Sequence, residues 1–160
     1  MKVLDVGCGK GSASVFFAEK FGCSVTGLDI TEDLLEKAKW AVEKRNLQDK
    51  VEFKQADATS LPFENETFDR TIFQAVLFFV KDEDRALSET KRVLKKSGSV
   101  GAVEPSWKED PPSDVMIRAC SCICIEMLDV PTYDGWENLF RGAGFEDVKT
   151  TKLGAPASRR

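Results

Sequence analysis

The sequence contains no histidine, and this absence narrows the chemistry that it can perform. A Ser-His or Cys-His dyad, a histidine general base and most catalytic zinc sites all depend on an imidazole. Tyrosine occurs once, and the five cysteines are an odd number that cannot all pair within the chain. Any reaction that this protein catalyses must therefore proceed without an imidazole of its own.

Long apolar runs are also missing. The longest, residues 72–80, is interrupted by Gln74 and falls well short of the roughly 20 residues that span a bilayer. Met1 and Lys2 lead directly into a short apolar stretch, without the pattern of a secretory signal. We therefore expect no membrane span and a reducing, cytoplasmic setting. The net charge of −4 argues against a free-standing nucleic-acid binder.

Short β-type runs alternate with helical ones along the 160 residues, which suit one domain. Strands are expected at residues 3–6, 25–29, 51–56, 69–73, 100–103 and 145–153, and helices at 12–21, after Thr31, and at 82–94, 113–129 and 133–143. This alternation predicts an α/β fold: a Rossmann-like, doubly wound, mainly parallel sheet of about six strands with helices on both faces. Ligands bind such sheets beyond the carboxyl ends of the strands.

The turn after the first expected strand is the most distinctive part of the sequence. Gly7, Gly9 and Gly11 follow Asp5 at alternate positions, and Asp29 ends the second strand, where a carboxylate can bind ribose hydroxyls. Dinucleotide dehydrogenases favour G-x-G-x-x-G without the preceding acid, which would repel a pyrophosphate. An acid there suits a ligand that carries an amino group and a sulfonium. A tight turn without a ligand is the alternative.

Several segments, in order, resemble the class I S-adenosylmethionine-dependent methyltransferases. Residues 3–11 resemble motif I of that family, and residues 26–30 the ribose-binding end of the second strand. Further similar segments are residues 55–58, 61–63, 68–69, 92–98 and 143–145. The resemblance covers roughly residues 1–150 and is closest in style to the small-molecule methyltransferases of ubiquinone and menaquinone biosynthesis. It implies a single S-adenosylmethionine-binding methyltransferase domain over residues 1–160.

The resemblance also implies which residues bind the cofactor: Asp5, Gly7, Cys8, Gly9, Gly11, Asp29, Ile30, Asp57, Ala58 and Gln74. Asp5 would orient the amino group of the cofactor through the loop, the glycines would pass close to its methionine portion, and Asp29 would hold the ribose hydroxyls. Ile30 would pack on the adenine. These four roles place the cofactor across the ends of the first two strands.

The remaining two roles fall on the later strands. Asp57 would accept a hydrogen bond from the adenine amino group, with the backbone N–H of Ala58 beside it. Gln74 would lie near the methionine portion. A solvated turn is the alternative for Asp57, and an ordinary polar residue at a strand end is the alternative for Gln74.

Methyl transfer by in-line displacement suits a sequence without histidine. The thioether that leaves S-adenosylmethionine, to give S-adenosylhomocysteine, is neutral and needs no acid, so alignment of the reactants can supply much of the rate. A base is needed only if the acceptor carries a proton. Glu104, after the fifth strand, is the catalytic candidate, with a surface carboxylate as the alternative.

The acceptor is expected to be a small, apolar molecule. Residues 104–134 form the segment that varies on the acceptor side, and Phe78 and Phe79 suggest an apolar wall. No metal is expected, because Cys120 and Cys124 share a helix face without the usual C-x-x-C pairs.

Two departures from the family pattern shape the remaining expectations. The first strand begins at residue 2, without N-terminal cap helices, and no seventh strand follows the sixth. A sheet edge left open in this way exposes backbone donors and acceptors. Either a partner chain or second copy covers it, or the chain is a fragment or a short paralogue. The alternative function is a cofactor-binding module with little activity of its own, needing a partner or having a regulatory role.

Overall fold

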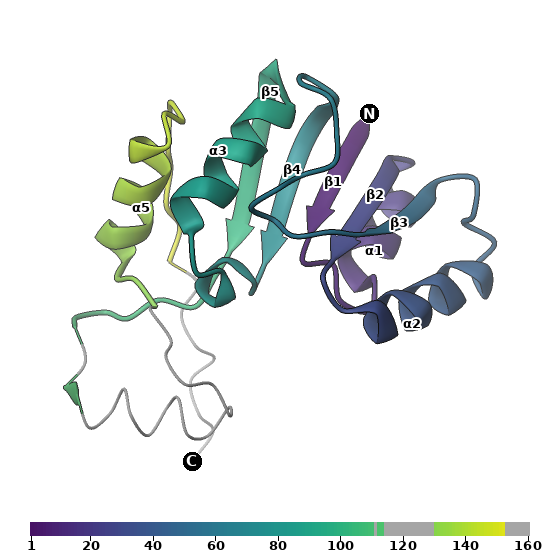
Figure 1. The fold of residues 1–160 in the computed structure, drawn as a ribbon, viewed down its shortest axis with the longest axis horizontal. Helices are drawn as coiled ribbons and strands as arrows, with labels where there is room; N and C mark the ends of the chain where they lie inside the picture. The colour runs from purple at the N-terminus through teal and green to yellow at the C-terminus, as the bar shows by residue number, and fades with distance from the viewer. Residues whose placement is uncertain (111, 114–129, 153–160) are drawn as a thin grey trace.

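Five parallel strands form one sheet in the order β3-β2-β1-β4-β5 (Figure 1). The computed structural model describes residues 1–110, 112–113 and 130–152. The strands are β1 (Lys2–Val6), β2 (Ser24–Asp29), β3 (Val51–Gln55), β4 (Phe68–Gln74) and β5 (Leu94–Val103). The helices are α1 (Ser12–Phe21), α2 (Glu32–Glu43), the 3-10 helix η1 (Leu77–Phe79), α3 (Glu83–Val93) and α5 (Tyr133–Gly142). The predicted Rossmann-like α/β architecture is confirmed.

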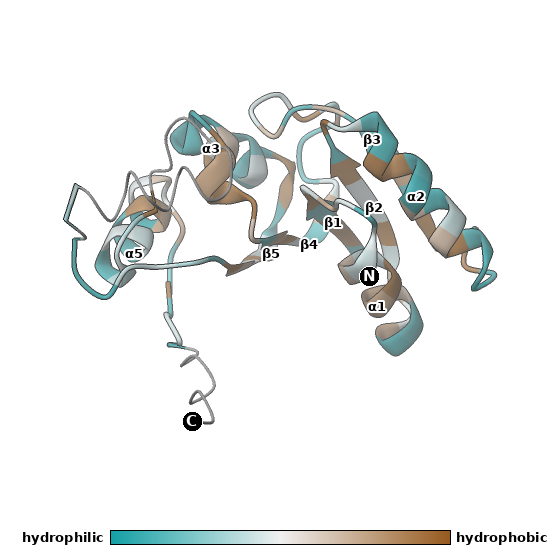
Figure 2. Ribbon diagram, turned by 90° about the horizontal axis from the view of Figure 1, so that it is seen from below, coloured by the Kyte–Doolittle hydropathy of each residue, from teal (hydrophilic) through white to brown (hydrophobic). Residues whose placement is uncertain are grey.

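Apolar residues alternate between the two faces of β1 and divide the core into two layers. Leu4 and Val6 belong to the core beneath α3 and α5, whereas Val3 belongs to the core beneath α1 and α2. Figure 2 shows α1 and α3 on opposite sides of the sheet. A parallel sheet needs both faces covered, and the alternating connections provide that cover.

The order of the strands reverses beside β1. The chain runs from β1 outward through β2 to β3, and then returns to the other side of β1 for β4 and β5. Pairing of β1 with both β2 and β4 is parallel, so the ends of these strands lie along one edge of the sheet. The loops that follow β1 and β4 diverge at this edge, which is where open α/β sheets bind ligands.

The fifth strand is longer than the sequence predicts. It begins at Leu94, not at residue 100, because the polar residues 95–98 form an irregularity within the strand rather than a turn before it. Leu94 pairs with Phe68, and the register then shifts so that Ser99 pairs with Arg70. Pairing with β4 thus outweighs the local preference of residues 95–98 for a turn.

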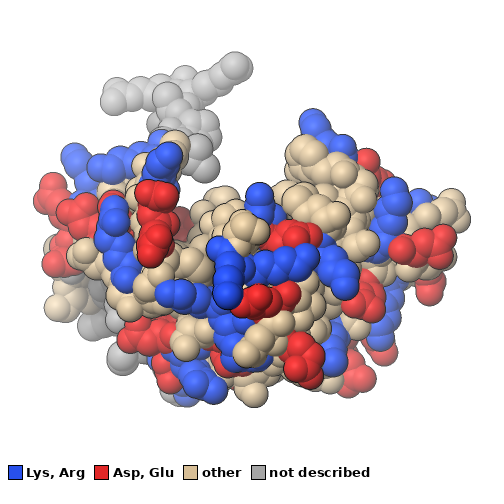
Figure 3. Space-filling view, turned by 90° about the horizontal axis from the view of Figure 1, so that it is seen from above, with Lys and Arg blue, Asp and Glu red and all other residues tan. Residues whose placement is uncertain are grey.

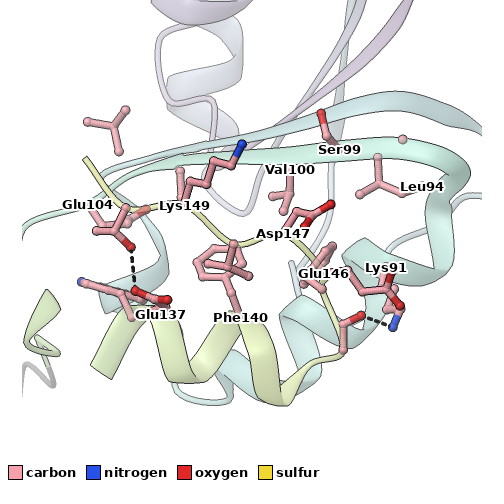
Figure 4. Close-up of a pocket in the computed structure, with 18 of the residues that line it drawn as sticks. Lys91, Leu94, Ser99, Val100, Glu104, Glu137, Phe140, Glu146, Asp147 and Lys149 are labelled. Carbon is pink, nitrogen blue, oxygen red and sulfur yellow. Dashed lines mark hydrogen bonds between the residues drawn. The ribbon is translucent and has the colours of Figure 1, made fainter. Parts of the chain in front are cut away.

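The predicted sixth strand is wrong in the residues that the structure describes. Residues 145–152 contain no strand, and a cavity of about 1230 Å³ separates them from the outer edge of β5 (Figure 4). Phe145 and Val148 do pack against the core beneath α5, so their apolar side chains are partly buried without strand pairing to β5. The described sheet therefore has five strands rather than about six. A partner chain along β5 stays a prediction.

Other expectations fall on residues that the structure does not describe. The helix predicted at 113–129 lies there except for Ser113, as do Cys120, Cys124 and the end of the predicted sixth strand. Among the described helices, none is both long and apolar enough to cross a membrane. On the face shown in Figure 3, basic and acidic side chains are interspersed, with no broad area of one sign.

A charge pair between the buried Glu89 and the half-buried Arg92 joins α3 to the loop that follows β3. Glu89 is only 7% exposed, and its oxygens accept hydrogen bonds from Arg92 at 2.8 and 2.9 Å and from the Leu61 N–H at 3.0 Å. Arg92 also donates to the carbonyls of Leu61 and Phe63, at 2.9 and 2.7 Å. The pair therefore fixes this loop through both of its charges.

Arg92→Met is expected to lower the free energy of unfolding by about 2 kcal/mol, because it leaves the buried Glu89 carboxylate without its nearest cation. Urea denaturation measures the change. Arg141→Met is the matched control, since the Arg141–Glu137 pair is exposed and such pairs contribute under about 1 kcal/mol. Equal losses in the two variants would show that the Arg92 network does not hold the loop.

Candidate functional site

The glycine loop between β1 and α1 is held by packing at two glycines and is open at the third. A Cβ at Gly7 would lie 2.2 Å from Cγ2 of Val76, and one at Gly11 would lie 2.8 Å from the Phe53 ring. Among the described residues, no atom other than those of Gly9 and its two chain neighbours lies within 4 Å of a Cβ placed at Gly9, and its φ of +52° favours glycine. Gly7 and Gly11 therefore serve packing, whereas no described side chain fills the space beside Gly9.

Asp29 bridges the end of β2 and the glycine loop. Its Oδ2 accepts from the Gly9 N–H at 2.8 Å, and its Oδ1 accepts from the Thr31 N–H at 2.9 Å. Each carboxylate oxygen has a second lone pair that can accept another donor. The structure thus brings together Gly9 and Asp29, two of the residues that the sequence assigns to the cofactor, and fixes the carboxylate before any ligand arrives.

Ile30 follows Asp29 as an exposed apolar surface. Ile30 is 65% exposed, and its backbone carbonyl accepts a hydrogen bond from the Gln55 side chain at 2.9 Å. A large aliphatic side chain held open beside a fixed carboxylate is suited to contact with a flat ring.

Asp5 lies beneath the loop rather than in the open space. It is 1% exposed, and its Oδ2 accepts from the Ser14 hydroxyl at 2.5 Å. Burial raises the pKa of Asp5 to about 6; the Ser14 hydrogen bonds act in the opposite direction, and the charge of Asp29 adds to the increase. Any effect of Asp5 on a ligand must therefore pass through the loop above it.

Cys8 contributes its backbone rather than its thiol. Its N–H donates to the Leu28 carbonyl at 2.9 Å, which closes the loop against β2. The side chain is buried, and its sulfur would lie 3.0 Å from a Cβ at Gly27. Burial, and then the charges of Asp5 and Asp29, raise the pKa of the Cys8 thiol, so it remains protonated.

Asp57 and Ala58 begin the loop after β3, on the far side of Asp29. The Ala56 N–H donates to the Asp29 carbonyl at 3.2 Å, which ties the start of this loop to the end of β2. Asp57 Oδ1 accepts from the N–H and the hydroxyl of Thr59, at 2.8 and 2.7 Å, and these bonds lower the pKa of Asp57. Both bonds recorded within the described chain end on Oδ1, which leaves Oδ2 for an outside donor.

Gln74 ends β4 and lines a second, smaller cavity of about 350 Å³ at the same edge. The first turn of α1 contributes Ser12 to this cavity, and the body of α1 contributes Phe16. Ile72 and Val103 line it from β4 and β5. Phe16 and Val103 are 49% and 56% exposed, so the cavity presents an apolar surface beside Gln74.

Glu104 lies directly after β5, and its side chain reaches the loop after β4. Both of its oxygens lie 3.1 Å from the Val76 N–H, and Oε1 also accepts from the Leu77 N–H at 3.1 Å. Burial raises the pKa of Glu104, against the lowering effect of these backbone donors. Sequence reasoning missed η1 and this contact, since no local pattern in residues 75–79 announces a carboxylate from another strand.

Comparison with known families matches residues 4–101 to a family described as a methyltransferase domain. The chain belongs to this methyltransferase family. The match covers β1 through most of β5 and includes the glycine loop, Asp29, Asp57 and Gln74. The resemblance proposed from the sequence is confirmed.

Individual relatives share the sequence over different lengths. An uncharacterized protein of Haemophilus influenzae is 33% identical over 93% of this chain, and a demethylmenaquinone methyltransferase of Lactobacillus johnsonii is 37% identical over 68%. The crystal structure of a putative methyltransferase from Bacillus halodurans covers 91% of this chain with a TM-score of 0.79 and 30% identity. The chain spans 60%, 45% and 62% of these three proteins.

Proposed function

We propose that this chain binds S-adenosylmethionine at the glycine loop and transfers its methyl group to a small, apolar acceptor. The observation that carries the proposal is the Asp29 carboxylate, fixed on the Gly9 N–H at 2.8 Å beside free space. A structurally similar protein, a phospholethanolamine N-methyltransferase of Haemonchus contortus, has been solved in complex with S-adenosylhomocysteine, and this supports the choice of cofactor. The proposed setting is the cytoplasm, and the proposed product is S-adenosylhomocysteine.

The described residues fit this cofactor along the whole edge of the sheet. Asp29 would accept both ribose hydroxyls on its remaining lone pairs, and the exposed Ile30 would contact the adenine. Asp57 Oδ2 and the backbone of Ala58 would bind the polar rim of the adenine. Gly9 leaves room for the chain of the methionine portion, and Gln74 lies at its far end.

The proposed reaction requires little acid or base catalysis by the protein. When bound, S-adenosylmethionine supplies a methyl group on a positively charged sulfur, which leaves as a neutral thioether. The task of the protein is to bind the acceptor in line with that methyl group and to exclude water. A site without histidine can perform this task, and a general base is needed only for an acceptor that carries a proton.

The cavity of about 350 Å³ beside Gln74 supports an apolar acceptor. Phe16, Ile72 and Val103 line it, and Phe78 and Phe79 lie in the adjoining loop with ring centroids 3.9 Å apart. Apolar walls with few polar groups are typical of sites for small apolar molecules. The demethylmenaquinone methyltransferase among the relatives is in keeping with this class of acceptor.

Asp29→Ala is expected to weaken binding of S-adenosylhomocysteine by about 1–3 kcal/mol, because it removes a charged acceptor from two donors. Titration calorimetry measures the change. The control is Asp33→Ala, which removes an exposed carboxylate from the first turn of α2, close in sequence but not on the glycine loop. If Asp29→Ala bound as tightly as Asp33→Ala, the ribose assignment would be wrong.

Transfer of a labelled methyl group into a cell extract tests the activity. With the wild-type chain, labelled S-adenosylmethionine should yield a labelled small molecule that partitions into organic solvent, which mass spectrometry can then identify. Asp29→Ala should give little product. Binding without any labelled product would instead support the alternative, a cofactor-binding module that needs a partner or regulates another protein.

A further inference from the structure

Glu104 connects two loops that both border the proposed cofactor site. The glycine loop follows β1, and the loop of residues 75–79 follows β4, so the two lie side by side where the strand order reverses. The only carboxylate that the described residues place on the backbone of the second loop comes from neither loop, but from the end of β5.

The loop after β4 starts in a conformation that needs support. Ala75 has a φ of +54°, in the left-handed region that costs a residue with a Cβ roughly 1–2 kcal/mol. Its N–H donates to the Val103 carbonyl at 2.8 Å, which continues the β4–β5 pairing by one residue. The next two N–H groups, of Val76 and Leu77, donate to Glu104. β5 and Glu104 together therefore hold three successive N–H groups of this loop.

The held loop presses on the glycine loop through one side chain. A Cβ at Gly7 would lie 2.2 Å from Cγ2 of Val76 and 2.7 Å from its Cβ, so Val76 fills the space that only glycine leaves. The same loop begins after Gln74 and carries Phe78 and Phe79 on η1. Displacement of Val76 would release the glycine loop and move the apolar wall together.

We propose that Glu104 is a positioning residue, which holds Val76 against Gly7 and thereby sets the affinity of the cofactor site. The inference rests on the proposed function, because it assigns the cofactor to the glycine loop. All three contacts of the Glu104 carboxylate go to the backbone N–H groups of Val76 and Leu77, two of them on Oε1, so the side chain is oriented toward the loop. Glu104 acts on the reaction through the loop, in contrast to the general base that the sequence suggests.

The nearly isosteric variant Glu104→Gln separates the two roles. A glutamine amide has one oxygen to accept the donors and turns an NH₂ group toward them, so the loop should loosen. In the ligand-free protein, the Val76 and Leu77 amides should exchange with deuterium at least tenfold faster, while amides in α2 keep their rates. S-adenosylhomocysteine should bind about tenfold more weakly, and Glu104→Asp, which retains the charge, should recover part of that loss.

The variant Val76→Ala distinguishes a specific effect of Glu104 on the loop from general destabilisation of the fold. It should weaken binding by itself, and adding Glu104→Gln to it should cause little further loss, because both changes act through one contact. Glu137→Gln, in an exposed pair on α5, is the control that should bind as the wild type does. Losses that simply add, or exchange rates that do not change, would overturn the proposal.

A general base would give a different pattern. Glu104→Gln would then bind S-adenosylhomocysteine normally, while the turnover number fell at least a hundredfold and lost its dependence on pH. If the wild type bound no S-adenosylhomocysteine, the proposed function would fail and the coupling to the cofactor with it. The exchange rates of Val76 and Leu77 would in that case still distinguish a tethered loop from a free one.

Discussion

Asp5→Asn is expected to stabilise the protein at neutral pH and to remove part of its pH dependence. Asp5 is 1% exposed, and burial raises its pKa from 3.8 to about 6. A shift of about two units corresponds to roughly 3 kcal/mol between the charged and neutral forms. The ionised carboxylate is therefore a cost that the folded state bears at pH 7, and asparagine removes it while keeping an acceptor for Ser14.

The direction of the pH dependence follows from the raised pKa. Below pH 3.8 Asp5 is protonated in both the folded and the unfolded states, and the stability from this group is fully present. As the pH rises toward 6, the unfolded state ionises first, so this contribution is progressively lost. The loss is complete once the pH has passed through the folded pKa of about 6 and Asp5 is ionised in both states. The advantage of Asp5→Asn over the wild type should thus grow between pH 4 and 7 by up to about 3 kcal/mol.

Urea denaturation of both proteins at pH 4, 5, 6 and 7 measures this difference, because every other titrating group is common to the two. Parallel stability curves would show that the pKa of Asp5 is not raised in the folded state. A buried acid that costs stability beneath a ligand-binding loop is the expected sign of a functional site. We therefore also expect Asp5→Asn to weaken binding of S-adenosylhomocysteine, even though the fold gains stability.

Gly7→Ala is expected mainly to destabilise the fold, whereas Gly9→Ala is expected mainly to weaken cofactor binding. At Gly7 the new methyl group would meet Val76 at 2.2 Å with φ at +68°, so overpacking and strain together should lower the free energy of unfolding by about 2–4 kcal/mol. At Gly9 the new methyl group would meet no atom of the described residues within 4 Å, beyond its chain neighbours, and the strain at φ +52° alone should cost about 1 kcal/mol. Gly9→Ala places its methyl group in the space assigned to the cofactor.

Two measurements distinguish these glycines. Urea denaturation should rank Gly7→Ala as clearly less stable than Gly9→Ala. Titration with S-adenosylhomocysteine should show at least a tenfold loss of affinity for Gly9→Ala under conditions where it is fully folded. Equal stability losses, or normal binding by Gly9→Ala, would contradict the assignment of packing to one glycine and of ligand contact to the other.

The sequence predicted the parts of the fold that depend on local pattern. Buried strands such as β1 and β2 are short apolar runs, and α1 begins after a glycine turn, so their boundaries agree with the structure to within a residue or two. The edge position of β3 also followed from its alternating residues. The sequence placed Gly9 and Asp29 at one edge of the sheet, because Gly9 follows β1 and Asp29 ends β2, but it did not predict the hydrogen bond between them.

The errors arose where a distant segment decides the local conformation. Residues 95–98 look like a turn, but they lie inside β5, where Lys95 forms an ion pair with Asp69 at 2.7 Å. The prediction of a sixth strand was wrong because an apolar pattern indicates burial but does not show that a neighbouring strand is available for pairing. Glu104 contacts Val76, 28 positions away, and Leu77, 27 positions away at the start of η1, and neither segment indicates the other in the sequence.

Titration calorimetry of the wild-type chain with S-adenosylhomocysteine, S-adenosylmethionine and NAD tests the proposed cofactor site most directly. The site built on Asp29 and Gly9 should bind both sulfur ligands and bind NAD more weakly, since Asp5 beneath the glycine loop disfavours a pyrophosphate there. Tighter binding of NAD than of either sulfur ligand would contradict the proposed function.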